Sequence, residues 1–211
     1  MDIIKAIKEA KEKSKKRNFV QSIDLIINFK GIDFSKVENR LNLEIVLPKG
    51  LGKKVEGVVI ADDDLLPEAK KHADKVITQA ELEKLGKNKR EAKKLASKYK
   101  FFIASAKLMP LVGRSLGQVL GPRNKMPKPV PPNAKLEGII ERMRKTVRIK
   151  SKGKYLPTIH TVIGSEEMSD EDLGENAMTV INAIKEKLPN KEGNIRSIYV
   201  KTSMGPSVKV E

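Results

Sequence analysis

"DDDLLPEAKKHADKVI", residues 62–77, marks the point at which the pattern of apolar and polar residues along the sequence changes. Before it, β-branched and polar residues alternate as they do in paired strands, whereas after it helical segments alternate with short apolar runs. Pro67 suits the first turn of a helix, and Val76 and Ile77 form a brief strand behind that helix. The stretch therefore predicts the start of a small unit with α/β layers.

The segments that follow continue this alternation. "NKREAKKLASKYK" at 88–100 predicts a helix, and "FFIASA" at 101–106 predicts a buried strand. A helix interrupted by Gly113 and Gly117 comes next, followed by a Pro-rich segment and by a helix at 136–147. We expect these elements to form a Rossmann-like three-layer α/β domain.

The two ends of the chain resemble each other and differ from its middle. Alternating residues predict strands at 22–29, 40–48, 158–164 and 197–204, and amphipathic spacing predicts helices at 3–16 and 169–188. Together they predict a split α+β sandwich with helices on one sheet face and the other face open, an architecture that often binds RNA. The expected fold class is thus α+β and α/β in two domains: this outer sandwich, made from both chain ends, and the inserted three-layer domain.

The distribution of charge indicates where one domain is inserted into the other. Residues 1–66 carry 13 basic and 11 acidic side chains, residues 67–156 carry 24 and 7, and residues 157–211 carry 6 and 9. We therefore predict a discontinuous domain from 1–66 and 157–211 and an inserted basic domain at 67–156, with Pro67 and Pro157 near the crossings. Because the chain would cross twice through short connections, the expected motion is a hinge between two rigid bodies.

The overall charge favours a polyanionic partner. The formal net charge is +16 and the sequence pI is about 9.8, so counterion release would drive binding to nucleic acid. The sequence contains neither a long apolar run nor a secretory signal, and it has no cysteine. These features predict a cytoplasmic protein without disulfides or thiolate metal sites.

Patterns typical of enzymes are weak in this sequence. No glycine-lysine pair continues into a phosphate-binding loop, and the Gly-rich stretch at 50–57 precedes a strand rather than a helix. His72 and His160 are too isolated for a metal cluster or a catalytic triad, and the acids at 62–64 suit helix capping. We expect no enzyme activity, catalytic residue, metal or cofactor. A nonspecific basic RNA-binding scaffold protein and, less favoured, a nucleic-acid enzyme remain as alternatives.

Two stretches resemble signature segments of a known family. "LGQVLGPRNKMPKP" at 116–129 and "SIYVKTSMGPSVKV" at 197–210 are similar to segments of the large-subunit ribosomal protein L-one family. The same family is also resembled, in the expected order, by "FVQSIDLIINFKGID" at 19–33 and "LPKGLGK" at 47–53. The Lys-rich composition resembles the archaeal branch of the family. The likeness runs over nearly the whole chain.

The resemblance implies partners as well as a fold. Members of this family bind a helical junction of 23S ribosomal RNA in the stalk beside the transfer RNA exit site, where they assist release of deacylated tRNA. They also bind a similar element in their own messenger RNA and repress its translation. The chain is accordingly expected to bind 23S rRNA, its own mRNA and exit-site tRNA, in the cytoplasmic large subunit, and to be monomeric when free.

The resemblance also implies which residues contact RNA. They are Phe19, Ser22, Lys152, Lys154, His160, Thr202, Ser203, Met204, Gly205 and Pro206. The last five form a neutral turn, which suits a shallow RNA minor groove read by shape and by short hydroxyl and backbone contacts. The hydroxyls would come from Thr202 and Ser203, and Gly205 would let the main chain approach closely. Asn18 stands where the family often has a basic residue, which puts a phosphate contact there in doubt.

Overall fold

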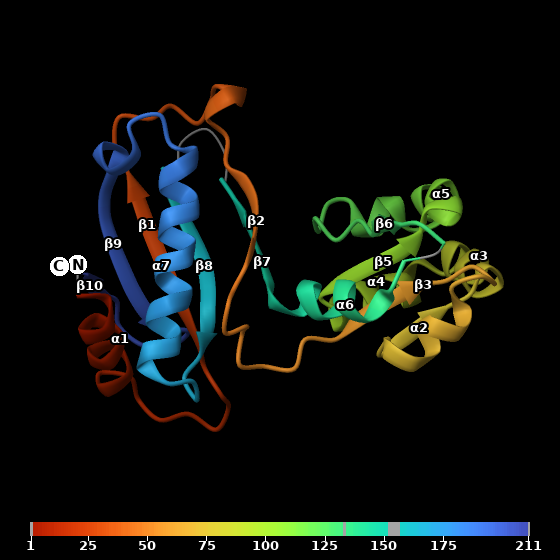
Figure 1. The fold of residues 1–211 in the computed structure, drawn as a ribbon, viewed down its shortest axis with the longest axis horizontal. Coiled ribbons are helices and arrows are strands. Elements are labelled where there is room, and N and C mark those ends of the chain that lie inside the picture. Colours follow the sequence, from red (N-terminus) through yellow and green to blue (C-terminus); the bar gives the residue numbers. More distant parts are fainter. Residues whose placement is uncertain (1, 133, 152–156, 211) are drawn as a thin grey trace. The chain divides into compact units, whose positions relative to one another are not determined.

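The computed structural model describes residues 2–132, 134–151 and 157–210, and it forms two compact units. The outer unit consists of Met1–Lys53 and Lys145–Glu211, and the inserted unit is Lys54–Arg144 (Figure 1). Both crossings come earlier in the chain than Pro67 and Pro157, where the sequence placed them.

Strand pairing explains this shift of the two boundaries. Residues 57–60 lie within the 1–66 part of the predicted outer domain, but they form β3 (Gly57–Ile60), which pairs in parallel with β4 (Lys75–Ile77) and β5 (Phe101–Ser105) of the inserted unit. Conversely, β7 (Thr146–Lys150) pairs antiparallel with β2 (Asn42–Val46) of the outer unit. The partner of a strand comes from a distant part of the chain, and composition alone does not identify it.

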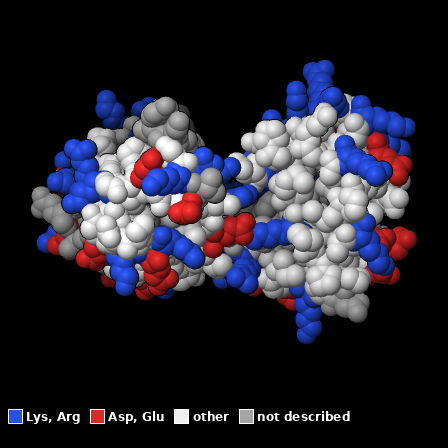
Figure 2. Space-filling view, turned by 90° about the horizontal axis from the view of Figure 1, so that it is seen from above, with Lys and Arg blue, Asp and Glu red and all other residues white. Residues whose placement is uncertain are grey.

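The new boundaries also correct the charge distribution. Lys54–Arg144 contains 20 basic and 11 acidic side chains, whereas the rest of the chain contains 23 and 16. The net charges are therefore +9 and +7, so the basic excess is shared between the units rather than confined to the inserted one. Figure 2 shows Lys and Arg side chains over the surfaces of both units, with acidic side chains among them.

The main sheet of the outer unit is antiparallel, with strand order β10-β9-β1-β8. Its strands are β1 (Ser22–Phe29), β8 (Thr158–Ser165), β9 (Ile195–Thr202) and β10 (Val208–Val210). Every second residue of β1 is buried, and α1 (Ile3–Glu12) and α7 (Asp170–Lys187) pack on that buried side (Figure 1). The predicted α+β layer is present, but β2 pairs with β7 in a separate sheet instead of joining this one.

The inserted unit contains a parallel sheet between helices, with strand order β4-β3-β5-β6. Its other elements are α2 (Leu66–His72), α3 (Gln79–Lys87), α4 (Lys89–Lys98), α5 (Met109–Leu120), β6 (Lys128–Val130) and α6 (Leu136–Lys145). Val58 and Ile60 share one apolar cluster with buried residues of α3, α4 and α5. Val59 points to the opposite face, and the buried residues of α2 and α6 lie outside this cluster, which gives the expected three layers.

One predicted interruption in the inserted unit is absent, and the helix predicted at 169–188 of the outer unit is present as α7. Helix α5 runs without a break through Gly113 and Gly117, because helical geometry tolerates glycine at a modest cost. Ser169 caps α7 by accepting a hydrogen bond from the Asp172 amide at 3.1 Å. Short 3-10 helices lie at Val37–Asn39, Ala106–Leu108 and Lys191–Asn194. None of the described helices is long and apolar enough to span a membrane.

Candidate nucleic-acid interface

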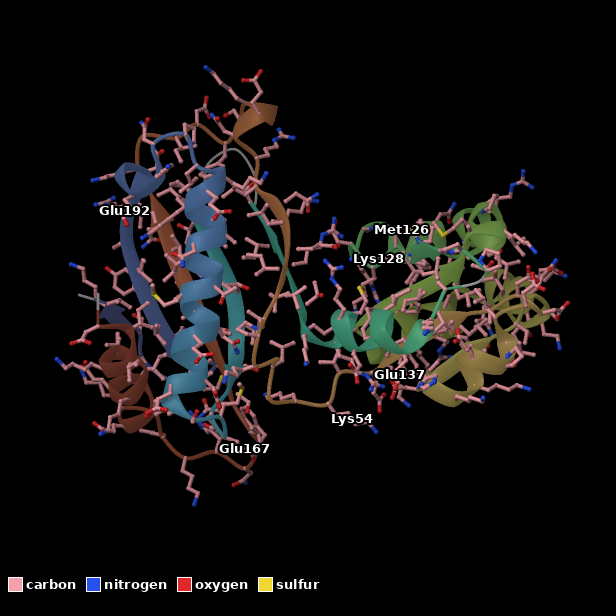
Figure 3. All side chains as sticks on the ribbon, viewed as in Figure 1. Lys54, Met126, Lys128, Glu137, Glu167 and Glu192 are labelled. Atoms are coloured by element: carbon pink, nitrogen blue, oxygen red, sulfur yellow. The ribbon has the colours of Figure 1, made fainter. Side chains whose placement is uncertain are left out.

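One end of the outer sheet brings together segments that lie far apart in the sequence. β1 begins at Ser22, which pairs with Ser165 at the end of β8, and Ile23 pairs with Thr202 at the end of β9. Glu167, labelled in Figure 3, marks this end beyond β8. The turn at 202–206 follows β9, so it lies beside the start of β1.

Hydrogen bonds fix the backbone of this turn. The Ser203 amide donates to the Ser22 carbonyl at 2.9 Å, and the Gly205 amide donates to the Thr202 carbonyl at 3.2 Å. The Ser203 hydroxyl accepts from the Ser22 amide and donates to the Ser22 carbonyl, both at 3.2 Å. Ser22 and Ser203 therefore hold the turn against β1.

Thr202 lies inside the fold rather than on its surface. The residue is 0% exposed, and its hydroxyl donates to the Ser14 hydroxyl at 2.9 Å. A Cβ atom on Gly205 would lie 2.3 Å from Thr202 Oγ1, so the missing side chain of Gly205 makes room for this buried hydroxyl. Direct RNA contact by the Thr202 hydroxyl does not fit this geometry, because the hydroxyl is already bonded and covered. Thr202 and Gly205 instead position the turn.

Met204 is the residue that the turn presents outward. Its side chain is 61% exposed, whereas its amide is held by the Gln21 side-chain oxygen at 3.1 Å. Phe19, three residues before Ser22, is 54% exposed, and Pro206 is also exposed. Exposed apolar side chains that gather beside a hydrogen-bonded turn are candidates for a binding surface.

Gln21 and Glu166 form a support that the sequence reasoning missed. Gln21 is 1% exposed, and its amide and side-chain nitrogen donate to the two carboxylate oxygens of Glu166 at 2.8 and 3.2 Å. The same side-chain nitrogen lies 3.0 Å from the Ser14 hydroxyl. The sequence did contain a signal for this support. Gln21 continues the every-second-residue pattern of Ile23 and Leu25, which indicates a buried position, and a buried polar side chain needs hydrogen-bond partners.

Lys53 is a second residue that the sequence reasoning missed. Its ammonium group donates to the Val20 carbonyl at 2.7 Å and to the Ser22 hydroxyl at 3.0 Å. The preceding loop bends through Gly50 and Gly52, whose φ angles are 69° and 64°. This left-handed backbone explains the glycines of "LPKGLGK" and places one cation beside the neutral turn.

His160 lies on the same sheet but away from the turn. It pairs with Ile26, four residues along β1 from Ser22, which corresponds to roughly 13 Å of strand. Half-buried Asp24 lies between these positions on β1, and burial raises its pKa although Lys201, His160 and Lys53 oppose the shift. The structure therefore does not bring His160 to the turn.

The predicted contacts at Lys152 and Lys154 fall outside the described residues. In the part of the chain that the structure describes, no group of three or more His, Asp or Glu side chains is placed to hold a metal ion. The described interface thus includes exposed apolar side chains, among them Met204 and Phe19, together with the cation Lys53. Such a surface suits a ligand recognised by shape and close backbone approach.

Comparison with known proteins agrees with these motifs. Residues 8–206 match the model of the ribosomal protein L1p/L10e family. The chain is 52% identical over 210 residues to the large ribosomal subunit protein uL1 of Methanothermobacter thermautotrophicus, covering 99% of this chain and 98% of that protein. It is also 52% identical to the uL1 protein of Pyrococcus abyssi, covering 99% and 95% of the two chains. The uL1 protein of Methanothermococcus thermolithotrophicus is 50% identical, with 100% and 98% covered. The chain therefore belongs to the ribosomal protein L1p/L10e family and is of the archaeal type.

Proposed function

We propose that this protein is a structural component of the large ribosomal subunit and that the turn at 202–206 binds a folded junction of ribosomal RNA. Large-subunit relatives that match the whole chain support the first part. The observation that carries the second part is the 61% exposed Met204 on a backbone held by Ser22 and Gln21. This function places the protein in the cytoplasm, within the ribosome, and it requires no catalytic residue or cofactor.

The chemistry of the turn fits RNA better than it fits a generic polyanion. Base-paired RNA presents a wide, shallow minor groove with 2′-hydroxyls, and proteins read that groove mainly by shape. Met204 offers an adaptable apolar surface. Gly205 has no side chain and Pro206 has a compact one, so the main chain of the turn can approach RNA closely. Lys53 beside Ser22 supplies a charge for a neighbouring phosphate. Long charged side chains in the turn itself would prevent this close approach.

The proposal extends to two finer activities implied by the family resemblance. The first is repression of the protein's own mRNA: a messenger element that imitates the rRNA junction would occupy the same turn, so the two RNAs would compete. The second is contact with tRNA at the ribosomal exit site and assistance of its release. Competition between junction RNA and the leader of its own messenger is the direct test of the first activity. The release rate of deacylated tRNA from ribosomes with and without the protein tests the second.

Binding of a short 23S junction fragment and of a scrambled RNA of equal length tests the central proposal. The full-length protein is compared with Met204→Asp, which places a negative charge on the proposed surface. Met178→Asp is the matched control. Met178 is a 42% exposed methionine on α7, the helix that packs on the buried face of the main sheet, and it is not part of the turn. We expect Met204→Asp to weaken junction binding at least tenfold and Met178→Asp to leave it unchanged.

Other outcomes would redirect the assignment. Equal binding of both RNAs by the wild-type protein, with a steep salt dependence, would indicate a nonspecific basic scaffold protein. Equal losses in the two methionine variants would show that added negative charge, rather than the turn, decides binding. Magnesium-dependent cleavage of either RNA would indicate an enzyme.

A further inference from the structure

The outer side of α4 in the inserted unit gathers cations. Lys93, Lys94 and Lys98 are all exposed, and their spacing of one, four and five residues places them on one side of the helix. Lys100 lies just beyond the C-cap residue Tyr99 and is exposed as well. Glu91 is the acid of this helix, near its N-terminus. The C-terminal half of α4 is therefore strongly basic.

The loop after α5 adds two more cations to this surface. The Arg123 guanidinium donates to the Lys93 carbonyl at 3.1 Å and to the Ser97 hydroxyl at 3.0 Å. The Lys125 ammonium donates to the Ala96 and Tyr99 carbonyls at 2.7 and 2.8 Å. These bonds place both cations on the last turn of α4, where the helix dipole favours positive charge. We call this surface the α4 basic face; it consists of Lys93, Lys94, Lys98, Lys100, Arg123 and Lys125.

The charges of the α4 basic face are not neutralised within the protein. Among the residues that the structure describes, none of these six cations forms an ion pair, whereas Lys107 and Arg144 of the same unit pair with Asp64 and Asp74. Although Lys100 as a whole is exposed, surrounding protein atoms partly desolvate its ammonium group and lower its pKa, and the nearby Lys125 lowers it further. Burial also lowers the pKa of Lys125, with a contribution from Arg123. Arg123 and Lys125 also stabilise the end of α4, but that role does not account for the neighbouring exposed lysines, whose mutual repulsion opposes folding.

We propose that the α4 basic face binds the phosphate backbone of an RNA double helix, independently of base sequence. The ten residues of α4 extend over about 15 Å, a length over which a duplex presents several phosphates. Lysines and an arginine without acidic partners are the groups that bind phosphates by counterion release. The protein would thus contact RNA at a second surface, in the unit that does not contain the turn at 202–206.

RNA fits this face better than an acidic protein does. Interfaces between proteins generally contain an apolar, well-packed centre surrounded by polar residues. The exposed side of α4 offers charged and hydroxyl side chains, and the loop adds a single large exposed apolar side chain, Met126, labelled in Figure 3. This inference rests on the proposed function only in taking RNA as the partner, since it uses none of the residues of the turn.

The experiment compares two charge-matched triple variants of the full-length protein. One carries Lys93→Gln, Lys94→Gln and Lys98→Gln on the α4 basic face. The other carries three Lys→Gln substitutions at exposed lysines of the same unit, in or near α2: Lys70, Lys71 and Lys75. The probe is a short RNA duplex of mixed sequence, titrated at several salt concentrations. We expect the first triple variant to lower the salt-dependence slope by about 3 and the second to change it by less than about 1.

A second measurement uses the unmodified protein and does not depend on how a variant folds. Acetylation of lysines by a soluble reagent is compared with and without the duplex, and the modified lysines are identified by mass spectrometry. We expect Lys93, Lys94 and Lys98 to be protected and Lys70 and Lys71 to react as before. Equal slopes for both triple variants, or equal protection of the two sets, would overturn the proposal by showing diffuse attraction.

The proposals for the two RNA-binding surfaces can be refuted independently of each other. Loss of junction preference in Met204→Asp, with duplex binding intact, tests the turn alone. Loss of duplex binding in the α4 triple variant, with the preference for junction over scrambled RNA intact, tests the α4 basic face alone.

Discussion

Replacing Gly205 with alanine tests whether the turn depends on the buried Thr202 hydroxyl. The new Cβ would lie 2.3 Å from Thr202 Oγ1, whereas ordinary contacts begin near 3.4 Å, so the atoms must separate by about 1 Å. Thr202 is 0% exposed, and rotating its side chain would break the bond to Ser14. Overpacking costs about 1–3 kcal/mol and a buried hydrogen bond about 1 kcal/mol, which together give a destabilisation of about 2–4 kcal/mol.

Calorimetry and RNA binding measure the two consequences of this substitution. The melting temperature should fall by roughly 5–10 °C. Junction binding should weaken at least tenfold, because the strain moves Met204. Gly193→Ala is the control in the same unit, since the nearest atom to its new Cβ is Asn190 Cβ at 3.6 Å. That variant should retain both stability and binding.

A double-mutant cycle identifies the cause of the strain. Thr202→Ala removes the hydroxyl that the new methyl group would meet, so Gly205→Ala with Thr202→Ala should be less destabilising than the sum of the single changes. We expect a coupling of about 1 kcal/mol or more. Additive effects, or a Gly205→Ala variant as stable as the wild type, would refute the argument that Gly205 makes room for Thr202.

Three further changes test other contacts of the outer unit. Lys53→Gln should weaken junction binding and lower the salt slope by about 1, with little loss of stability, because the exposed ammonium bonds only Val20 and Ser22 among the described residues. Burial raises the pKa of the Asp24 carboxyl group above its ordinary 3.8. The folded protein therefore binds the carboxyl proton more tightly than the unfolded chain does. The corresponding stability is lost as pH rises from 3.8 through the folded pKa. Asp24→Asn should therefore stabilise the protein at neutral pH and remove this dependence in denaturation series at several pH values; an unchanged profile would contradict the sign. Asn176→Leu should cost about 2–5 kcal/mol in chemical denaturation, because the buried amide bonds the carbonyls of Gly50 and Ile163 at 2.9 and 2.8 Å; a loss below about 1 kcal/mol would show that the loop has other support.

Strong local patterns allowed several elements to be predicted. The alternation at 22–29 corresponds to β1, and the amphipathic spacing at 169–188 corresponds to α7. The interruption predicted in α5 was wrong, because glycine lowers helix stability without ending a helix that packs well. Periodicity tells which side of an element is buried, and that information lies within each segment.

Parts of the candidate interface could be predicted only from motifs, and others not at all. The turn at 202–206 was found by resemblance, but neither the burial of Thr202 nor the supporting bonds of Gln21 and Glu166 follow from their positions in the sequence. Lys53 reaches Ser22 from 31 residues away in the chain. Contacts over such separations depend on how the elements pack.

The sequence by itself determined many of the helices and strands, the two-part organisation, the basic character and the family. Only the tertiary structure decided that β3 belongs to the inserted unit and β7 to the outer one, and thereby that both units are basic. It also decided that Thr202 lies inside the turn while Met204 lies outside. The physical reason is that local propensity and hydrophobic spacing act within a segment, whereas strand partners and buried hydrogen bonds join segments that are distant in the chain.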